Sequence, residues 1–366
     1  MNFRIHTHDF TQAVQRVQGV VDKKHTIPIL GNILLVVEDA TRAHVCATNL
    51  ELGIRTQVPI LDGEPGSLTL PAGTLTDLAR ELPDGEVSLV EEENAWARLT
   101  CHDFTTRIAG LPQGDFPELP SFSITSAFQL DSDLLKRAIT TTNFAISRDE
   151  SRYALTGAHV LMTDTGIQLT ATDGHRLSQF QSTGVMSGEG VIVPLKAMTE
   201  VKKLCDAAPV IMVAIEEQQI LFQGGDTILS SRLINGQFPD YSQVIPDRET
   251  CSCVDLAKDL FVAALRRVLL LGGDSRQVVF AFTDATLTLS ATDPNMGTAT
   301  ESIPCDWTGD PMTLGFNGRY LLDALAVCES ETVTMAVRGP LDPGLWYADA
   351  QAQHVIMPMR VAEGGE

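Results

Sequence analysis

The stretch LTLPAGTLTDLARELPDGEVSL, at Leu68–Leu89, has two counterparts later in the chain. They are VIVPLKAMTEVKKLCDAAPVIMV at Val191–Val213 and MTLGFNGRYLLDALAVCESETV at Met312–Val333. All three contain a short apolar strand, a Pro or Gly, an amphipathic helix, a polar turn and a second strand. The Pro or Gly residues, Pro71, Pro194 and Gly315, lie 123 and 121 positions apart. Solenoid repeats have a period of roughly 20–50 residues, so this spacing predicts three copies of a whole domain.

Two further patterns recur in the same order. The tripeptide Ala-Thr-Asn at 47–49 returns as Ala-Thr-Asp at 171–173 and 291–293. Apolar residues also recur with the i, i+3, i+4, i+7 spacing of one helical face. These faces are Phe10, Ala13, Val14 and Val17; Leu135, Ala138, Ile139 and Thr142; and Phe261, Ala264, Leu265 and Val268. An ordered set of elements at similar offsets is not explained by chance patterning.

The strand pattern predicts an α+β fold. Turn residues between alternating apolar and polar runs indicate antiparallel pairing. Two helices and about eight strands per copy give a unit with its helices on one face of antiparallel sheets. Pro and polar residues cluster near 120–123 and 246–249, so we expect the domains to be residues 1–121, 122–247 and 248–366.

Length and composition agree with a packed, water-soluble chain. The 366 residues are 44% hydrophobic, and no apolar run reaches the ~20 residues that a membrane span needs. The first residues do not have the pattern of a signal peptide. Seven scattered cysteines argue against a disulfide framework and favour a reducing, cytoplasmic setting.

The sequence does not contain a strong catalytic motif. Phosphate-binding glycine loops, zinc-protease motifs, nucleophile elbows and paired CxxC motifs are all absent. His6 and His8 lack a third metal ligand, so we predict neither a metal nor a cofactor. Asp173 and His175 form a dense polar cluster with Gly174 and Arg176, but the other two repeats lack it. An enzyme that uses Asp173 and His175 is therefore an alternative that we do not favour, and no catalytic residue is assigned.

Charge alone leaves two interpretations open. The net charge of −21 argues against nucleic acid binding, although an average charge does not say where charges lie. Basic residues lie on the predicted helices, and acidic residues crowd the predicted hairpin tips. The helices could present a positive surface for phosphates, or their Lys and Arg side chains could simply be solvated. The basic residues are Arg16, Arg80, Lys136, Arg137, Lys196, Lys202, Lys203, Arg266, Arg267 and Arg319.

Six segments closely resemble the β subunit family of bacterial DNA polymerase III, the replicative sliding clamps. The resemblance runs from end to end in family order, and ATDGHRL followed by MPMR is its most specific part. The segments are IPILGN (Ile27–Asn32), RYALTG (Arg152–Gly157), ATDGHRLS (Ala171–Ser178), FPDY (Phe238–Tyr241), GFNGRYLLDAL (Gly315–Leu325) and VIMPMR (Val355–Arg360).

The resemblance implies three tandem DNA-clamp domains that form half of a six-domain ring. Clamps of this family are head-to-tail homodimers that encircle double-stranded DNA without reading its sequence. They tether the polymerase III α subunit and so raise its effective concentration at the primer end. The δ subunit of the clamp loader, other polymerases and repair proteins are expected to dock through short hydrophobic motifs.

The resemblance also assigns residues to three surfaces. The implied DNA contacts are Lys24, Arg148, Arg152, Lys196 and Lys202, and the implied dimer interface is Thr106, Ile108, Leu270 and Leu271. The implied peptide pocket comprises Leu155, Thr172, Gly174, His175, Arg176, Leu177, Pro239, Val244, Asn317, Tyr320, Val355, Ile356, Met357, Pro358, Met359 and Arg360. Methionine suits such a pocket because its flexible side chain adapts to varied apolar ligands.

Several positions depart from the family pattern. Thr106 replaces the usual aromatic residue at the interface, and Ala154 replaces another aromatic residue. Basic residues are missing at Gly73, Leu195 and Gln243. Ser275 stands where a pocket aromatic residue can occur, and Val361–Glu366 extend past the usual end. A specialised or spare clamp paralogue is therefore a second alternative.

Overall fold

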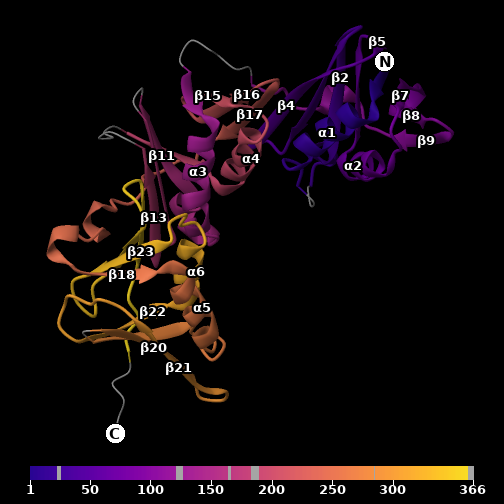
Figure 1. Cartoon of the computed structure of the whole chain (residues 1–366). Helices are drawn as coiled ribbons and strands as arrows, with labels where there is room; N and C mark the ends of the chain where they lie inside the picture. The colour runs from indigo at the N-terminus through magenta and orange to yellow at the C-terminus, as the bar shows by residue number, and fades with distance from the viewer. Residues whose placement is uncertain (23–25, 121–126, 164–165, 183–188, 284, 362–366) are drawn as a thin grey trace. The chain divides into compact units, whose positions relative to one another are not determined.

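The computed structural model describes residues 1–22, 26–120, 127–163, 166–182, 189–283 and 285–361. The chain divides into two compact units. The first consists of Met1–Leu135 and Lys196–Leu233, and the second of Lys136–Leu195 and Ile234–Glu366. Each unit therefore contains one terminal repeat and part of the central repeat (Figure 1).

The first unit is built on two antiparallel sheets. The five-stranded sheet has the order β5 (Asp62–Glu64), β1 (Asn2–His6), β7 (Glu86–Glu91), β8 (Trp96–Cys101) and β9 (Phe104–Ala109). The eight-stranded sheet has the order β10 (Phe128–Asp131), β15 (Val210–Glu216), β16 (Gln219–Gly224), β17 (Thr227–Arg232), β4 (Leu52–Pro59), β3 (Arg42–Thr48), β2 (Asn32–Asp39) and β6 (Gly66–Pro71).

The second unit has the same plan. Its eight-stranded sheet has the order β14 (Val191–Pro194), β11 (Gly157–Thr163), β12 (Gly166–Thr172), β13 (Arg176–Gln181), β25 (Ala352–Ile356), β24 (Gly344–Tyr347), β23 (Thr332–Val337) and β18 (Ser252–Ala257). Its four-stranded sheet has the order β21 (Gly297–Pro304), β20 (Thr286–Asp293), β19 (Gln277–Thr283) and β22 (Met312–Asn317).

Both eight-stranded sheets join strands of two consecutive repeats. β17 of the second repeat pairs with β4 of the first, from Thr227 opposite Thr56 to Ser231 opposite Leu52. β13 of the second repeat pairs in the same way with β25 of the third. Backbone hydrogen bonds therefore connect neighbouring repeats, and this explains why each compact unit includes part of the central one.

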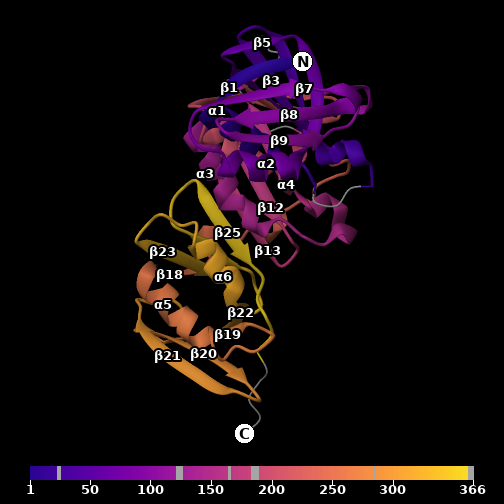
Figure 2. The same cartoon turned by 90° about the vertical axis from the view of Figure 1, so that its right-hand side faces the viewer.

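Six α-helices complete the described part of the chain. They are α1 (Thr7–Gln18), α2 (Ala72–Glu81), α3 (Ser132–Thr142), α4 (Leu195–Cys205), α5 (Lys258–Leu269) and α6 (Gly318–Leu325). All twelve residues of the three predicted helical faces are buried, as the apolar spacing predicted. In the second unit, α5 and α6 lie side by side against one face of the sheets (Figure 2). The predicted α+β architecture of three clamp-type repeats is thus confirmed.

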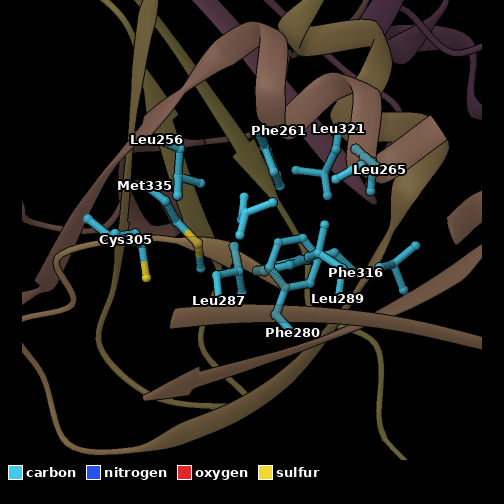
Figure 3. Packing of buried hydrophobic residues seen from close by; sticks show 14 of the residues in the cluster. Leu256, Phe261, Leu265, Phe280, Leu287, Leu289, Cys305, Phe316, Leu321 and Met335 are labelled. Carbon is cyan, nitrogen blue, oxygen red and sulfur yellow. The ribbon is translucent and has the colours of Figure 1, made fainter. Parts of the chain in front are cut away.

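The core of the third repeat shows how the helical face packs. Phe261 of α5 stacks on Trp346 of β24, with ring centroids 5.6 Å apart. Phe280 and Phe316 meet edge to face at 5.4 Å, an arrangement that aromatic pairs prefer. Figure 3 shows Phe261 and Leu265 of α5 and Leu321 of α6 in the same cluster as Phe280 and Phe316.

The recurring Ala-Thr-Asn/Asp tripeptide forms the same turn in each repeat. The side-chain oxygen of Asn49 accepts hydrogen bonds from the N–H groups of Glu51 and Leu52. Asp173 and Asp293 bind the equivalent N–H groups in the second and third repeats. An Asn or Asp side chain thus closes each turn, which gives the sequence recurrence a local physical cause.

One predicted helix boundary was wrong. Pro71 and Pro194 do precede α2 and α4 directly, but Gly315 lies inside β22, three residues before α6. The start of α6 is set instead by Asn317, whose Oδ1 accepts a hydrogen bond from the N–H of Arg319 at 3.0 Å. Gly315 is used for a close approach, because a Cβ there would lie 2.9 Å from the carbonyl oxygen of Met359.

The seven cysteines are all free thiols in the structure. None of the helices in the described residues is long and apolar enough to cross a membrane.

Candidate functional site

A cavity of about 190 Å³ opens on the second unit beside the junction of β13 and β25. It is smaller than the ~300–1,000 Å³ typical of pockets for drug-sized ligands, so it suits one or two large side chains of a peptide. Its lining residues are Leu155, Thr172, Gly174, Arg176, Leu177, Pro239, Asp240, Tyr241, Val244, Val355 and Met357.

The turn between β12 and β13 forms one wall. Asp173 closes this turn and places Gly174 at a positive φ of 86°, a conformation that favours glycine. A side chain at Gly174 would also meet the Arg152 guanidinium, whose Nη1 lies 2.7 Å from the Cβ position. The cavity therefore depends on a small residue at position 174.

Arg176 connects this wall to the rest of the unit. Its guanidinium donates to Asp173 Oδ2 at 3.0 Å, to Asp323 Oδ2 of α6 at 2.8 Å and to the Phe144 carbonyl at 2.6 Å. It also lies 4.5 Å from the centre of the Tyr320 ring, within cation–π range. Each of the three guanidinium nitrogens thus donates to a group of the protein, so the position of the Arg176 side chain beside the cavity is fixed.

The opposite wall comes from the FPDY segment. The Tyr241 hydroxyl accepts a hydrogen bond from Gln168 Nε2 at 2.7 Å, and its ring meets Phe238 edge to face at 6.1 Å. Asp240 lies at the rim, where hydrogen bonds from the hydroxyl and the N–H of Ser242 lower the pKa of its carboxyl group. Sequence reasoning missed Asp240 and Tyr241 as lining residues, although both lie in the motif that supplied Pro239.

The structure brings together nine of the sixteen residues assigned to the pocket. They are Leu155, Thr172, Gly174, Arg176, Leu177, Pro239, Val244, Val355 and Met357. Four of the others lie close to this group without lining the cavity. The His175 carbonyl accepts the N–H of Met357, Tyr320 packs on Arg176, and Pro358 and Met359 follow Met357, with the Met359 N–H bound to Gly315.

The remaining three residues assigned to the pocket lie elsewhere in the structure. Ile356 is buried in the core between α5 and the sheets, because adjacent residues of a strand point to opposite faces. Asn317 caps α6. The Arg360 side chain is exposed, and its carbonyl accepts a hydrogen bond from Gln277 Nε2 at 2.9 Å.

The alternative of an active site on Asp173 and His175 has no geometric support. Both carboxylate oxygens of Asp173 are used, Oδ1 by the turn and Oδ2 by Arg176. His175 is exposed, and its ring makes no hydrogen bond to any described residue. A general base needs a group within hydrogen-bond reach to act on, and this pair does not provide one.

A buried histidine lies one strand position from the pocket. His354 of β25 is enclosed between Ser178 and Phe144, and burial lowers its pKa to about 4. The Ser178 hydroxyl donates to the Thr141 carbonyl at 2.6 Å, so His354 Nδ1 donates to Ser178 Oγ at 2.8 Å. The fold therefore holds the neutral imidazole.

This burial predicts a pH-dependent stability. The unfolded chain binds a proton on His354 below a pH of about 6.5, but the folded protein resists protonation down to about 4. The free energy of unfolding should therefore fall by about 3 kcal/mol as the pH drops through this window. We expect His354→Gln to show a weaker pH dependence in calorimetric unfolding. His8→Gln, at an exposed position of α1, should behave like the wild type. Equal pH dependence in all three proteins would contradict this account.

Many of the basic helix residues have acidic partners in their own unit. Ion pairs join Arg80 to Asp77, Arg137 to Asp349, Lys196 to Asp22, Lys203 to Glu200, Arg267 to Glu301 and Arg319 to Asp323. Among the assigned DNA contacts, Arg152 binds the Asp173 carbonyl, whereas Arg148 and Lys202 lack an ionic partner among the described residues. Lys24 lies outside the described residues.

The four assigned interface residues lie in two places, on β9 and directly after α5. Ile108 is buried and Thr106 half-buried on β9, the last strand of the five-stranded sheet. Leu270 follows α5 and is exposed, and Leu271 is half-buried. Both groups lie next to a sheet edge that is unpaired in the described structure, since β21 beside α5 is also an edge strand.

Tandem repeats, open sheet edges and a small, mainly apolar pocket are typical of proteins that assemble with other chains. Three family models match the chain, for the N-terminal, central and C-terminal domains of the DNA polymerase III β subunit, at residues 1–120, 129–240 and 242–360. The chain belongs to this family of sliding clamps, which are non-catalytic processivity factors of DNA replication.

Individual relatives agree with this family over their full length. The β sliding clamp of Caulobacter vibrioides is 34% identical over 99% of this chain and 100% of its own. That of Escherichia coli K12 is 30% identical over the same shares. A Bartonella birtlesii sliding clamp, solved with bound griselimycin, has a TM-score of 0.92 and 31% identity over 99% of this chain and 100% of its own.

Proposed function

We propose that the chain forms a head-to-tail homodimeric ring around duplex DNA and docks partner proteins through the pocket on the second unit. The observation that carries the docking site is the cavity of about 190 Å³, with its apolar lining and its wall fixed by Arg176. The ring is supported by the open edges of β9 and β21 and by the family to which the chain belongs. The partners we expect are the polymerase III α subunit, the δ subunit of the clamp loader, and other polymerases and repair proteins. Their shared feature is a short hydrophobic motif.

The domain organisation that we propose is residues 1–121, 122–247 and 248–366. The first boundary agrees with the gap at 121–128 between matched family segments, whereas the second lies six residues after the gap at 241. The ring interface that we propose joins the open edge of β9, with Thr106 and Ile108, to the region of Leu270 and Leu271 beside β21. Main-chain hydrogen bonds between two open edges give such an interface its register.

Sliding requires attraction to phosphates without base recognition. Arg148 and Lys202 supply uncompensated positive charge among the described residues, and Arg152 and Lys196 contribute through partly compensated positions. Because many other basic helix residues are paired internally, we expect weak DNA binding with a modest salt dependence. Weak attraction suits a ring that is retained by topology rather than by affinity.

A pocket-blocking substitution tests the docking site. Val244 is 38% exposed at the cavity mouth, so Val244→Arg should fold normally and fill the entrance. We expect griselimycin, the ligand of the Bartonella clamp, to bind the wild type and to bind this variant at least about 30-fold more weakly, as for a lost hot-spot contact. Titration calorimetry measures both affinities.

The matched control is Leu61→Arg, which places the same charge at a 39% exposed position in the first unit. Its griselimycin affinity should equal that of the wild type. Equal affinities for all three proteins would show that the cavity is not the docking site.

A further inference from the structure

We infer, on the basis of the homodimer proposed above, that Phe104 is the apolar anchor of the subunit interface. It would pack on the helix side of a continuous sheet formed by β9 of one subunit and β21 of the next. The family resemblance pointed to Thr106 and Ile108 on this strand and did not include Phe104.

The two edges are long and unprotected. β9 has six residues and pairs only with β8 in the described structure, and β21 has eight residues and pairs only with β20. Neither strand contains a bulge, and the one proline is Pro304, the last residue of β21. Proteins usually protect such edges, because unpaired N–H and C=O groups invite another strand. Both edges are therefore available for strand addition.

Phe104 lies on the core side of its sheet. It is paired directly with Cys101 of β8, whose side chain is buried, and directly opposed residues share a face. Thr106 and Ile108 lie on the same side, since alternate residues of a strand share a face. Ile108 is buried, but the Phe104 side chain is 42% exposed. The Phe104 side chain is exposed because no strand of the described structure lies beside β9 on the side away from β8.

The edge at β21 offers an apolar counterpart. α5 packs along β21, and its Arg267 donates to Glu301 of that strand at 2.5 Å; Figure 2 shows the two elements together. Ala299 and Ile303 share the face of Glu301, because they oppose Ala291 and Leu287 of the core. Leu270, just after α5, is 74% exposed, the highest value among the large hydrophobic residues of the described chain.

The outer faces of the two sheets also match. On these faces, hydroxyl groups of the edge strand pair with hydroxyl groups of its neighbour in both sheets. The pairs are Thr100 with Thr105 at 3.5 Å, Thr292 with Thr298 at 3.1 Å and Thr288 with Ser302 at 2.9 Å. A joined sheet would therefore be polar outside and apolar inside on both sides of the junction. A slip of one residue would reverse this arrangement, so the pattern selects an in-phase pairing in which Phe104 lies inside.

A second copy of the chain is the partner that this pattern fits. β9 and β21 belong to one chain, so head-to-tail association gives each of these edge strands a partner strand. Such contacts form a closed ring when the rotations between successive subunits add up to a full turn. Thr106 supplies little apolar area at this junction. Phe104, two residues away on the same face, supplies the large side chain that interface anchors require.

Sedimentation equilibrium of the full chain tests the inference. We expect Phe104→Ala to raise the dimer dissociation constant at least tenfold. Leu270→Ala should raise it as well, whereas Leu341→Ala, at a 70% exposed turn position, should leave it within about threefold. The pair Phe104→Ala and Leu270→Ala should be less than additive, as contacting residues are. Wild-type circular dichroism spectra and unfolding transitions check that the variants are folded.

The results distinguish the homodimer from the role of Phe104 within it. A wild-type chain that is monomeric at every concentration would overturn the homodimer itself. A dimeric wild type whose dissociation constant is unchanged by Phe104→Ala would overturn the anchor alone and leave the ring in place.

Discussion

Replacement of Arg176 by Ala is expected to abolish tight binding at the pocket and to destabilise the second unit. The guanidinium joins Asp173, Asp323 and the Phe144 carbonyl. Its removal leaves the partly buried Asp173 carboxylate without its counter-charge and leaves Asp323 paired with Arg319 alone. Breaking a buried pair typically costs about 3 kcal/mol. The turn that carries Gly174 also loses its tie to α6. We therefore expect griselimycin affinity to fall about 100-fold.

Arg152→Ala is the matched control for this variant. Arg152 approaches the same turn, but its side chain is exposed and donates only to the Asp173 carbonyl and, more distantly, to Asp149. Its loss should reduce the free energy of unfolding by less than about 1 kcal/mol. Calorimetric unfolding and ligand titration of both variants provide the comparison. If Arg176→Ala were as stable as Arg152→Ala, the network around Arg176 would not hold the pocket in place.

Replacement of Trp346 by Ala should have the largest effect on stability. Its fully buried indole contacts three aromatic rings, of Phe261, Phe280 and Phe316, with centroids 5.6 to 6.3 Å away. Truncation of a buried tryptophan leaves a large cavity, and such changes cost about 4 kcal/mol. We expect the thermal transition of the second unit to shift down by several degrees in scanning calorimetry.

Trp96 provides the control within the same chain. This residue is exposed on β8, where its ring lies 4.9 Å from the Arg107 guanidinium. An exposed cation–π contact is worth about 1 kcal/mol or less, so Trp96→Ala should barely move the transition. Similar shifts for both variants would contradict the assignment of Trp346 to the core.

The fold was predictable from the sequence because its evidence is local and repeated. The helical faces that begin at Phe10, Leu135 and Phe261 are buried as their spacing predicted. The turns closed by Asn49, Asp173 and Asp293 follow from side chains that bind their own backbone. Each pattern needs only a few consecutive residues, and three copies of it reduce the role of chance.

The pocket was predictable in part, and the misses have physical causes. Val355 and Ile356 were both assigned to it, but neighbouring strand residues point to opposite faces, so only Val355 lines the cavity. Alternation along the strand was available from the sequence and would have removed Ile356. The place of Tyr241 depends on a hydrogen bond from Gln168, 73 residues away, and no local pattern reports such a contact.

The ion pairs of the basic helix residues could not be predicted from local sequence patterns either. Lys196 and Asp22 are 174 positions apart, and Arg267 and Glu301 are 34 positions apart. The sequence left open whether the basic residues face phosphates or solvent. The structure adds a third arrangement, in which many of them bind carboxylates of their own unit.

Retention on DNA of different topology tests the central claim most directly. The protein would be loaded by a clamp loader onto primed circular DNA, and half of the sample would then be cut with a restriction enzyme before gel filtration. A ring held by topology stays on the intact circles and slides off the cut ends. Equal retention on circular and linear DNA, or equal loss from both, would contradict the proposal that this chain encircles DNA.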